Sequence, residues 1–287
     1  MGDDELPAKY SISGETSGRE TGMNLTKRLA VRNLLGSVAL VSFFFGLASI
    51  IPAAADDYAY LDNSTGNGTD TDSFGVVDLT TGVYTECGKP STGLNGLGVG
   101  PDHQLYGTGQ GSTDDILYKI DVTNGTLTPV GQSGIHFGGV GSTKTGLYAL
   151  AANNDLYSVN YQTAAATLVG PIGIDLPGFW GLSTNANGLL LESEHTLYKL
   201  DPSTGAARLR GDGSEGRFGA EAWERGTLYG VSDEVPFAIY SISREDGSVS
   251  KVSTLTGVPE NLNPYGLAPI KDQVIQQKNI CKVHEIL

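Results

Sequence analysis

The chain repeats one pattern at a nearly constant spacing, and this repeat limits the folds that it can adopt. In its clearest copy, residues 117–131 (LYKIDVTNGTLTPVG), apolar and polar residues alternate on either side of Asn124-Gly125, which marks a tight turn between two strands. The residue at the start of this turn recurs at intervals of 43, 39, 41 and 42 residues. Its five copies are Asp78, Asp121, Asn160, Asp201 and Ser243. An all-β repeat of this length is typical of a propeller blade.

Asp121 is the residue of the clearest copy that most invites a chemical role. Its carboxylate stands where it can accept hydrogen bonds from the backbone N–H groups of the turn itself, which is the usual reason for Asp before a Thr-Gly or Asn-Gly turn. We therefore interpret Asp121 as a turn former rather than a catalytic residue.

Each repeat holds two further strands before its hairpin, which makes four strands per repeat. In the second repeat they are residues 96–99 and 104–108. The first repeat lacks the leading strand, since residues 58–61 match the second strand of the others, and residues 263–269 (NPYGLAP) match the missing one. We predict an all-β, five-bladed β-propeller of four antiparallel strands per blade, in which the C-terminal strand completes the first blade. Such closure removes the exposed sheet edges of an open array.

The predicted domain organisation has three parts. Residues 1–55 form an N-terminal extension with an export signal, residues 56–270 form the propeller, and residues 271–287 form a C-terminal tail with the pattern of a short amphipathic helix. The blades are expected at about 57–88 together with 263–269, 94–131, 135–170, 178–211 and 217–257.

The repeats resemble those of secreted β-propellers of the broad quinoprotein-like and YVTN-like type, which often read LY-x-hydrophobic-D-x-x-TG. The resemblance covers roughly residues 57–270 and implies a fold rather than an activity. The Trp-Asp dipeptide of WD40 repeats does not occur, and the kelch Gly-Gly doublet occurs only at Gly138-Gly139. Five blades are fewer than the quinoprotein enzymes use, so their cofactor is not implied.

A long uncharged segment, residues 34–55, follows three basic residues and ends in three alanines. The basic residues are Lys27, Arg28 and Arg32. We interpret the segment as an export signal cleaved near Ala55, with Met1 or Met23 as the start. The alternative is an uncleaved membrane anchor, because the segment is long enough to span a bilayer. The predicted location is therefore secreted, periplasmic or at the cell surface, with N-terminal anchoring as the alternative.

The net charge limits the kinds of binding partner, and the cysteines bear on the compartment. The formal net charge of −14 belongs to the chain after residue 55, which holds 27 acidic and 13 basic residues. Such a surface repels phosphate backbones, which argues against nucleic acid as a partner and leaves an extracellular ligand or protein. No membrane contact is expected beyond the export signal. The two cysteines, Cys87 and Cys281, are compatible with an oxidising compartment, and the sequence leaves open whether they pair.

The start of the first strand in each blade is the default place for a ligand, because it lies beside the central channel. There each repeat carries one residue followed by Gly, which suits five inner strands that crowd the axis. The pairs are Asn95-Gly96, Phe137-Gly138, Trp180-Gly181, Phe218-Gly219 and Tyr265-Gly266. The four rings and Asn95 are the candidate ligand-binding residues, with a sugar or another flat molecule as the ligand. The alternative is that the rings pack between blades.

The loops between second and third strands lie on the same face and are acidic. Residues 62–72 (DNSTGNGTDTD) form a Gly-rich loop that could wrap a Ca²⁺ ion through Asp62, Asp70 and Asp72, because carboxylate oxygens are the ligands that Ca²⁺ prefers. The loop fits no EF-hand spacing, and the alternative is a solvated acidic loop.

Catalytic machinery is sparse. Glu221 is the only acidic residue that we place on an inner strand, whereas glycoside hydrolysis needs a pair of carboxyl groups. His136 and Arg217 precede the strand-start aromatic residues of two blades and are the other catalytic candidates, with rim decoration as the alternative. We therefore expect an exported binding or scaffolding module of unknown ligand, with a glycan or Ca²⁺ as the leading candidates. The alternative is a hydrolase or lyase whose site surrounds Glu221.

Overall fold

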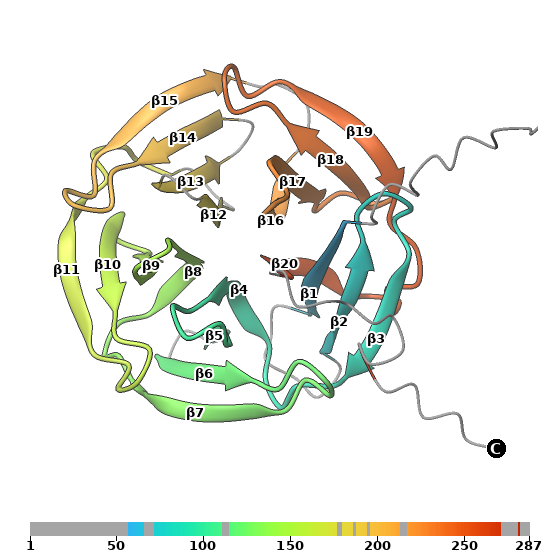
Figure 1. Ribbon diagram of the computed structural model, residues 1–287, viewed down its shortest axis with the longest axis horizontal. Helices are drawn as coiled ribbons and strands as arrows, with labels where there is room; N and C mark the ends of the chain where they lie inside the picture. Colours follow the sequence, from blue (N-terminus) through green and yellow to red (C-terminus); the bar gives the residue numbers. More distant parts are fainter. Residues whose placement is uncertain are drawn as a thin grey trace, which may run out of the picture. The chain divides into compact units, whose positions relative to one another are not determined.

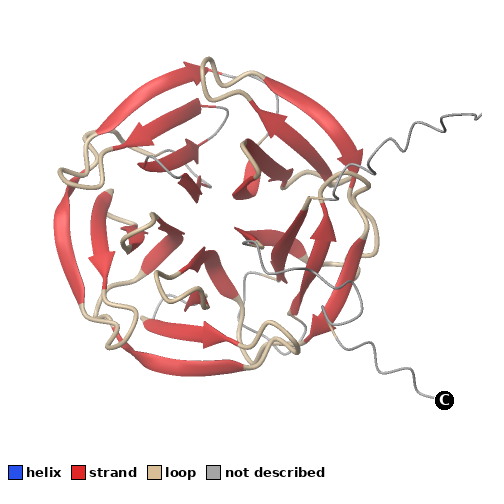
Figure 2. Cartoon of the chain, in the orientation of Figure 1, coloured by secondary structure: helices blue, strands red, loops and turns tan. Residues whose placement is uncertain are grey.

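A computed structural model describes residues 57–65, 72–110, 115–176, 180–185, 188–193, 196–212, 217–270 and 281. These residues form twenty β-strands in five antiparallel sheets of four strands, which surround a central axis (Figure 1). The described part of the chain contains no helix (Figure 2), and thus none that could cross a membrane. The predicted five-bladed β-propeller is confirmed. The export signal and all of the tail except Cys281 lie outside the described residues.

The strands of each blade follow one another from the axis to the rim. Blade 1 consists of β20 (Asn263–Pro269), β1 (Tyr58–Ser64), β2 (Ser73–Asp78) and β3 (Tyr84–Gly88). Blade 2 consists of β4 (Leu94–Val99), β5 (Leu105–Gly109), β6 (Ile116–Ile120) and β7 (Leu127–Gln132). Blade 3 consists of β8 (Phe137–Ser142), β9 (Leu147–Ala151), β10 (Asp155–Val159) and β11 (Ala166–Pro171). Blade 4 consists of β12 (Trp180–Asn185), β13 (Gly188–Ser193), β14 (Thr196–Leu200) and β15 (Ala207–Asp212). Blade 5 consists of β16 (Phe218–Glu224), β17 (Thr227–Ser232), β18 (Ala238–Ile242) and β19 (Val249–Thr254).

Blade 1 is assembled from two distant parts of the chain, as predicted. Strand β20 pairs antiparallel with β1, from Ala59 opposite Pro269 to Ser64 opposite Asn263. Figure 1 shows the blue β1 beside the red-orange β20. Cys281 forms a disulfide with Cys87 on β3, with the two Cα atoms 4.6 Å apart. The end of the chain is therefore joined to blade 1 by strand pairing and by a covalent bond.

The residues at the turn starts form the hairpins as predicted. Asp121 Oδ1 accepts hydrogen bonds from the backbone N–H of Thr123 at 2.9 Å and from its hydroxyl at 2.7 Å. These bonds lower the pKa of Asp121 below its ordinary value. Asn160 Oδ1 accepts the same bond from the N–H of Gln162 at 2.9 Å, although it carries no charge. The position therefore serves the turn in each case.

Glycine at the end of the repeat lets neighbouring blades meet at the rim. A Cβ atom built on Gly131 of β7 would lie 2.8 Å from the carbonyl oxygen of Thr163, in the hairpin turn of blade 3. The outer strands of three other blades meet the next hairpin in the same way, through Gly88 at Asn124, Gly170 at Thr204, and Gly211 at Asp246. The glycine that ends the repeat is therefore required by the close approach of two backbones.

The hydrophobic core lies in the seams between blades. The seam between blades 1 and 2 holds Phe74, Leu94, Leu97, Leu105 and Ile120, all buried. Each seam joins the side chains of two sheets, so every blade depends on its neighbours for burial of its apolar faces.

Candidate binding face

The first strands of the blades all begin on one face of the propeller. In blade 2 the start of β4 at Leu94 pairs with the end of β5 at Gly109, from which the chain leads to β6. The connections between second and third strands therefore lie on the same face as the strand starts. The candidate residues for ligand, metal and catalysis all come from this face or from the inner strands that begin there.

A β-bulge at the start of the first strand decides which side chains face the channel. In blade 3, Phe137 pairs with Ala151 and Gly139 with Leu150, which leaves Gly138 as the extra residue of β8. Blades 1, 2 and 5 have an equivalent irregularity. The extra residue is Tyr265 in blade 1 and Gly219 in blade 5, while in blade 2 Asn95 and Gly96 together lie opposite the single residue Thr108. One extra residue reverses the side to which the neighbouring side chains point.

Phe137 and Phe218 therefore lie in the core. Both precede the bulge, their exposed fractions are 1% and 2%, and their rings pack edge-on against Tyr157 and Tyr240 with centroids 5.6 and 5.5 Å apart. Packing between blades was the second interpretation of these rings. Matching them to the apolar Leu94, which is also buried before a bulge, would have indicated this from the sequence. Trp180 begins β12, and its side chain lies outside the described part.

Asn95 and Tyr265 occupy the bulge and remain half-buried at the channel mouth. The Asn95 amide donates a hydrogen bond to the carbonyl oxygen of Phe137 at 3.1 Å, which links blade 2 to blade 3. Tyr265 borders the cavity on the axis. Burial, and next the charge of Asp233, raises the pKa of the Tyr265 hydroxyl. Among the predicted aromatic side chains that the structure describes, Tyr265 is thus the one that remains accessible at the mouth.

A partly buried ion pair lies in blade 5 next to Tyr265. Arg217 Nη2 is 3.0 Å from Asp233 Oδ2, and the side chains are 34% and 13% exposed. The backbone N–H of Asp233 also donates to the carbonyl oxygen of Arg217 at 3.1 Å.

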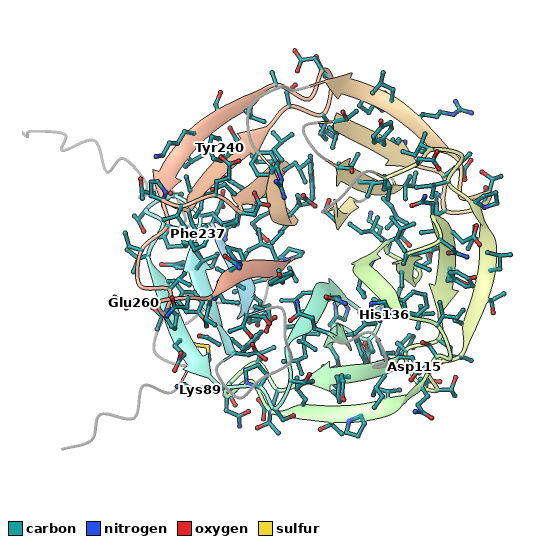
Figure 3. The ribbon with its side chains drawn as sticks, turned by 180° about the vertical axis from the view of Figure 1, so that it is seen from behind. Lys89, Asp115, His136, Phe237, Tyr240 and Glu260 are labelled. Carbon is teal, nitrogen blue, oxygen red and sulfur yellow. A yellow bond between two sulfur atoms is a disulfide. The ribbon has the colours of Figure 1, made fainter. Side chains whose placement is uncertain are left out.

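His136 lies on a different blade, just before β8, where Figure 3 labels it in the inner part of the ring. Its buried Nδ1 has no hydrogen-bond partner among the described residues. The structure thus brings Arg217, Asp233 and Tyr265 together and leaves His136 apart.

Glu221 lies deeper, on β16, and is 3% exposed. It borders the axial cavity, whose volume of about 10 Å³ is that of a single water molecule. Its carboxylate packs against Gly181 of blade 4, where a Cβ atom would overlap it. Among the described residues that line this cavity, Glu221 is the one acid. The arrangement therefore lacks the second carboxyl group and the space that glycoside hydrolysis requires.

A further set of polar side chains is buried at the seam between blades 1 and 2. Asp62 on β1 and Asp72 just before β2 both have exposed fractions of 0%. Asp62 Oδ2 accepts a hydrogen bond from the N–H of Leu94 at 3.3 Å, and Asp72 Oδ1 accepts one from the N–H of Thr65 at 3.3 Å. Burial raises the pKa of Asp62 well above its ordinary value, and the charge of Asp72 adds to this rise.

The interpretation of this segment as a solvated loop is therefore wrong for Asp62 and Asp72, because both side chains are covered by protein. Asp70 lies outside the described residues. Within the described part of the chain, no three His, Cys, Asp or Glu side chains gather as a metal site. The two aspartates alone remain as acidic ligands for a cation.

The chain matches no family model and no curated protein. It is similar in structure to β-propeller-like proteins. A crystal structure of a protein of unknown function from Bacteroides thetaiotaomicron has a TM-score of 0.51 and 17% identity, over 75% of this chain and 65% of that one. A crystal structure of the nidogen–laminin complex has a TM-score of 0.51 and 9% identity, over 74% of this chain and 97% of that one. Glutaminyl cyclase from Myxococcus xanthus has a TM-score of 0.41 and 12% identity, over 61% and 70%. At these identities the likeness shows the fold alone.

Proposed function

We propose that the protein is an exported binding or scaffolding module whose ligand contacts the face on which the first strands begin. The observation that carries this proposal is the group at the channel mouth, where Tyr265 stands next to the Arg217–Asp233 ion pair above a cavity too small for a substrate. An aromatic ring beside a few fixed polar groups is the usual composition of a small-molecule site. The fold is compatible with this role, and one structural neighbour was solved within a protein complex.

A glycan is the leading ligand. The Tyr265 ring could stack on a sugar, while Arg217 and Asp233 offer hydrogen-bond donors and acceptors for its hydroxyl groups. Export is supported by residues 34–55 and by the disulfide between Cys87 and Cys281, because disulfides persist in oxidising compartments.

The test is a glycan array followed by titration of the best ligand. Tyr265→Ala should weaken binding at least about tenfold, because truncation of a central aromatic contact commonly costs 1 kcal/mol or more. Leu209→Ala is the matched control, since Leu209 is 64% exposed on the outer strand β15, away from the mouth. A ligand that binds both variants like the wild type would contradict the proposed face. If no glycan binds, the glycan is refuted as the ligand class.

The hydrolase or lyase alternative has less support. Its central residue, Glu221, is buried beside a cavity the size of one water molecule. A panel of hydrolase and lyase substrates checks it directly. Turnover that Glu221→Gln abolishes would favour an enzyme over a binding module.

A further inference from the structure

Four buried side chains with oxygen atoms meet at the seam between blades 1 and 2. We call them the seam cluster: Asp62, Ser64 and Asp72 from blade 1 and Gln110 from blade 2. Three of them have exposed fractions of 0%, and that of Gln110 is 7%. The rest of this seam is apolar, with Phe74 and Leu94 among its buried residues. The seam cluster is therefore a polar end on an apolar interface.

The contacts show that these oxygens face blade 2. Asp62 and Ser64 are two residues apart on β1, so their side chains point to the same side of the sheet. Asp62 Oδ2 accepts a bond from the N–H of Leu94 at 3.3 Å, and the Ser64 hydroxyl donates to Gln110 Oε1. A Cβ atom on Gly93 would meet both Ser64 Oγ and Gln110 Oε1. The lack of a side chain at Gly93 thus leaves room for the two oxygen atoms to meet.

Among the described residues, no opposite charge balances the buried carboxylate of Asp62. The side chain has no ion-pair partner among the described residues, and its Oδ1 atom is buried without a hydrogen-bond partner. An uncompensated buried carboxylate is costly, and the neighbouring Asp72 increases the cost.

The fold itself does not require an acid at this place. Strand pairing matches Asp62 to Leu150 in blade 3 and to Val231 in blade 5, and both of these are buried and apolar. The matched residues of blades 2 and 4 are Thr108 and Glu192, so the position varies freely between apolar and polar residues. An acid that is expensive to bury and that the blade can replace by an aliphatic residue points to a ligand.

We propose that Asp62 and Asp72, together with Ser64 and Gln110, bind a Ca²⁺ ion that joins blade 1 to blade 2. Two carboxylates neutralise a divalent ion, and hydroxyl and amide oxygens are the hard ligands that Ca²⁺ prefers, with water to complete the coordination. Mg²⁺ fits less well, because it demands near-ideal octahedral geometry. This inference does not rest on the proposed function, since an ion in the seam would bind whether or not the channel mouth holds a ligand.

The experiment is calcium binding by the purified protein after treatment with a chelator and its removal. Isothermal titration should show one Ca²⁺ per chain, with a Kd of about 1 mM or tighter, the range of extracellular calcium modules. Ca²⁺ should also raise the melting temperature, while Mg²⁺ should have a smaller effect. Asp62→Asn and Asp72→Asn should each weaken binding at least about tenfold, because they remove charge from the ligand set. Asp201→Asn is the matched control, since Asp201 lies in an exposed hairpin turn and should leave binding unchanged.

Two results would overturn the proposal. In the first, the wild type shows neither bound Ca²⁺ nor a change in melting temperature at about 10 mM Ca²⁺, well above the expected Kd range. In the second, both aspartate variants keep wild-type affinity. If an aspartate variant does not fold, Ser64→Ala replaces it, because it keeps both charges and should still weaken binding several-fold.

Discussion

Blades 1 and 3 have the same four strands and the same order, yet they differ in construction. Blade 3 is continuous in the chain, from Phe137 to Pro171, and a tight turn at Asn154 joins its second and third strands. Blade 1 combines β20 with β1 to β3 and is also joined to Cys281 by a disulfide. The four-stranded arrangement of a blade therefore does not depend on whether its strands are consecutive in the chain.

The same two blades differ in chemistry at a matched buried position. Leu150 in blade 3 and Asp62 in blade 1 both pair with the third strand of their sheet, opposite Leu156 and Phe74. Leu150 packs in an apolar cluster with residues of blade 4, whereas Asp62 lies in the seam cluster. The matched site thus carries an aliphatic residue in one blade and an acid in the other, so an acid is not needed to form the blade.

Loss of the disulfide of blade 1 should cause the largest loss in the free energy of unfolding. Cys87 is the bulge residue of β3, where blade 3 has Val169. It closes a loop across a sequence separation of 194 residues, so the double variant Cys87→Ser/Cys281→Ser should lose about 4–5 kcal/mol of unfolding free energy. Urea titration measures this, with Val169→Ser as the control that changes the matching site without breaking a covalent bond. Equal loss in both variants would mean that the bond adds nothing to the closure of blade 1.

A polar residue at the matched site of blade 3 should lower the free energy of unfolding nearly as much as loss of the disulfide. Leu150 is fully buried, so Leu150→Asn removes apolar contacts and leaves an amide without a designed partner. We expect a loss of about 3–5 kcal/mol in the free energy of unfolding, measured by urea titration. Leu150→Val, which keeps the site apolar, is the control. A loss below about 1 kcal/mol would show that blade 3 tolerates polarity as blade 1 does.

The rim contact, which both blades share, should have an intermediate effect. Gly131→Ala places a methyl group 2.8 Å from the carbonyl oxygen of Thr163 in blade 3, and the strain should cost about 1–3 kcal/mol. The neighbouring exposed Gln132→Ala should stay within about 0.5 kcal/mol. Thermal unfolding compares the two, and equal melting temperatures would mean that the blades are not tightly packed at the rim.

Removal of the buried charge in blade 1 should stabilise the calcium-free protein. Folding raises the pKa of Asp62, so the protonated side chain contributes its full stability below the unfolded pKa of about 3.9, and this stability is lost as the pH rises through the folded pKa. In a buffer with chelator at pH 7, the free energy of unfolding of Asp62→Asn should be about 1–2 kcal/mol higher than that of the wild type, the usual cost of an unsatisfied buried group. Urea titrations from pH 3 to 7 should show the two proteins converging at low pH. A constant difference across this range would contradict a buried titrating carboxyl group.

Replacement of a turn-start residue in an outer hairpin should have the smallest effect on the free energy of unfolding. Burial acts to raise the pKa of Asp78, but hydrogen bonds from Thr80 and Thr81 outweigh it and lower the pKa overall. The resulting stabilisation is present above the unfolded pKa and is lost as the pH falls through the folded one. Blade 3 already has Asn160 at this position, so Asp78→Asn should change the unfolding free energy by less than about 0.5 kcal/mol at pH 7. A larger loss would show that the charge, rather than the acceptor oxygen, forms the turn.

The architecture could be predicted from the sequence because its signals are local. Alternation, turn residues and the spacing of the turn-start residue indicated the strands, the five blades and the closure by residues 263–269. The candidate site could be predicted only in part. The strand starts and the second-to-third-strand connections share one face as strand order predicts, but Phe137 and Phe218 do not reach it, because one extra residue in the bulge turns them into the core. Asn95 and Tyr265 share the same Gly-containing pattern and do reach it.

The sequence by itself determined the repeat, the number of blades and the role of residues such as Asp121, since each depends on a few neighbouring residues and on a fixed spacing. Only the tertiary structure decided the burial of Asp62 and Asp72, the pairing of Cys87 with Cys281 and the placing of Asp233 near Tyr265. These features depend on which side of a sheet a side chain points to and on what the next blade places against it. Contacts of that kind join residues far apart in the chain, and no local pattern records them.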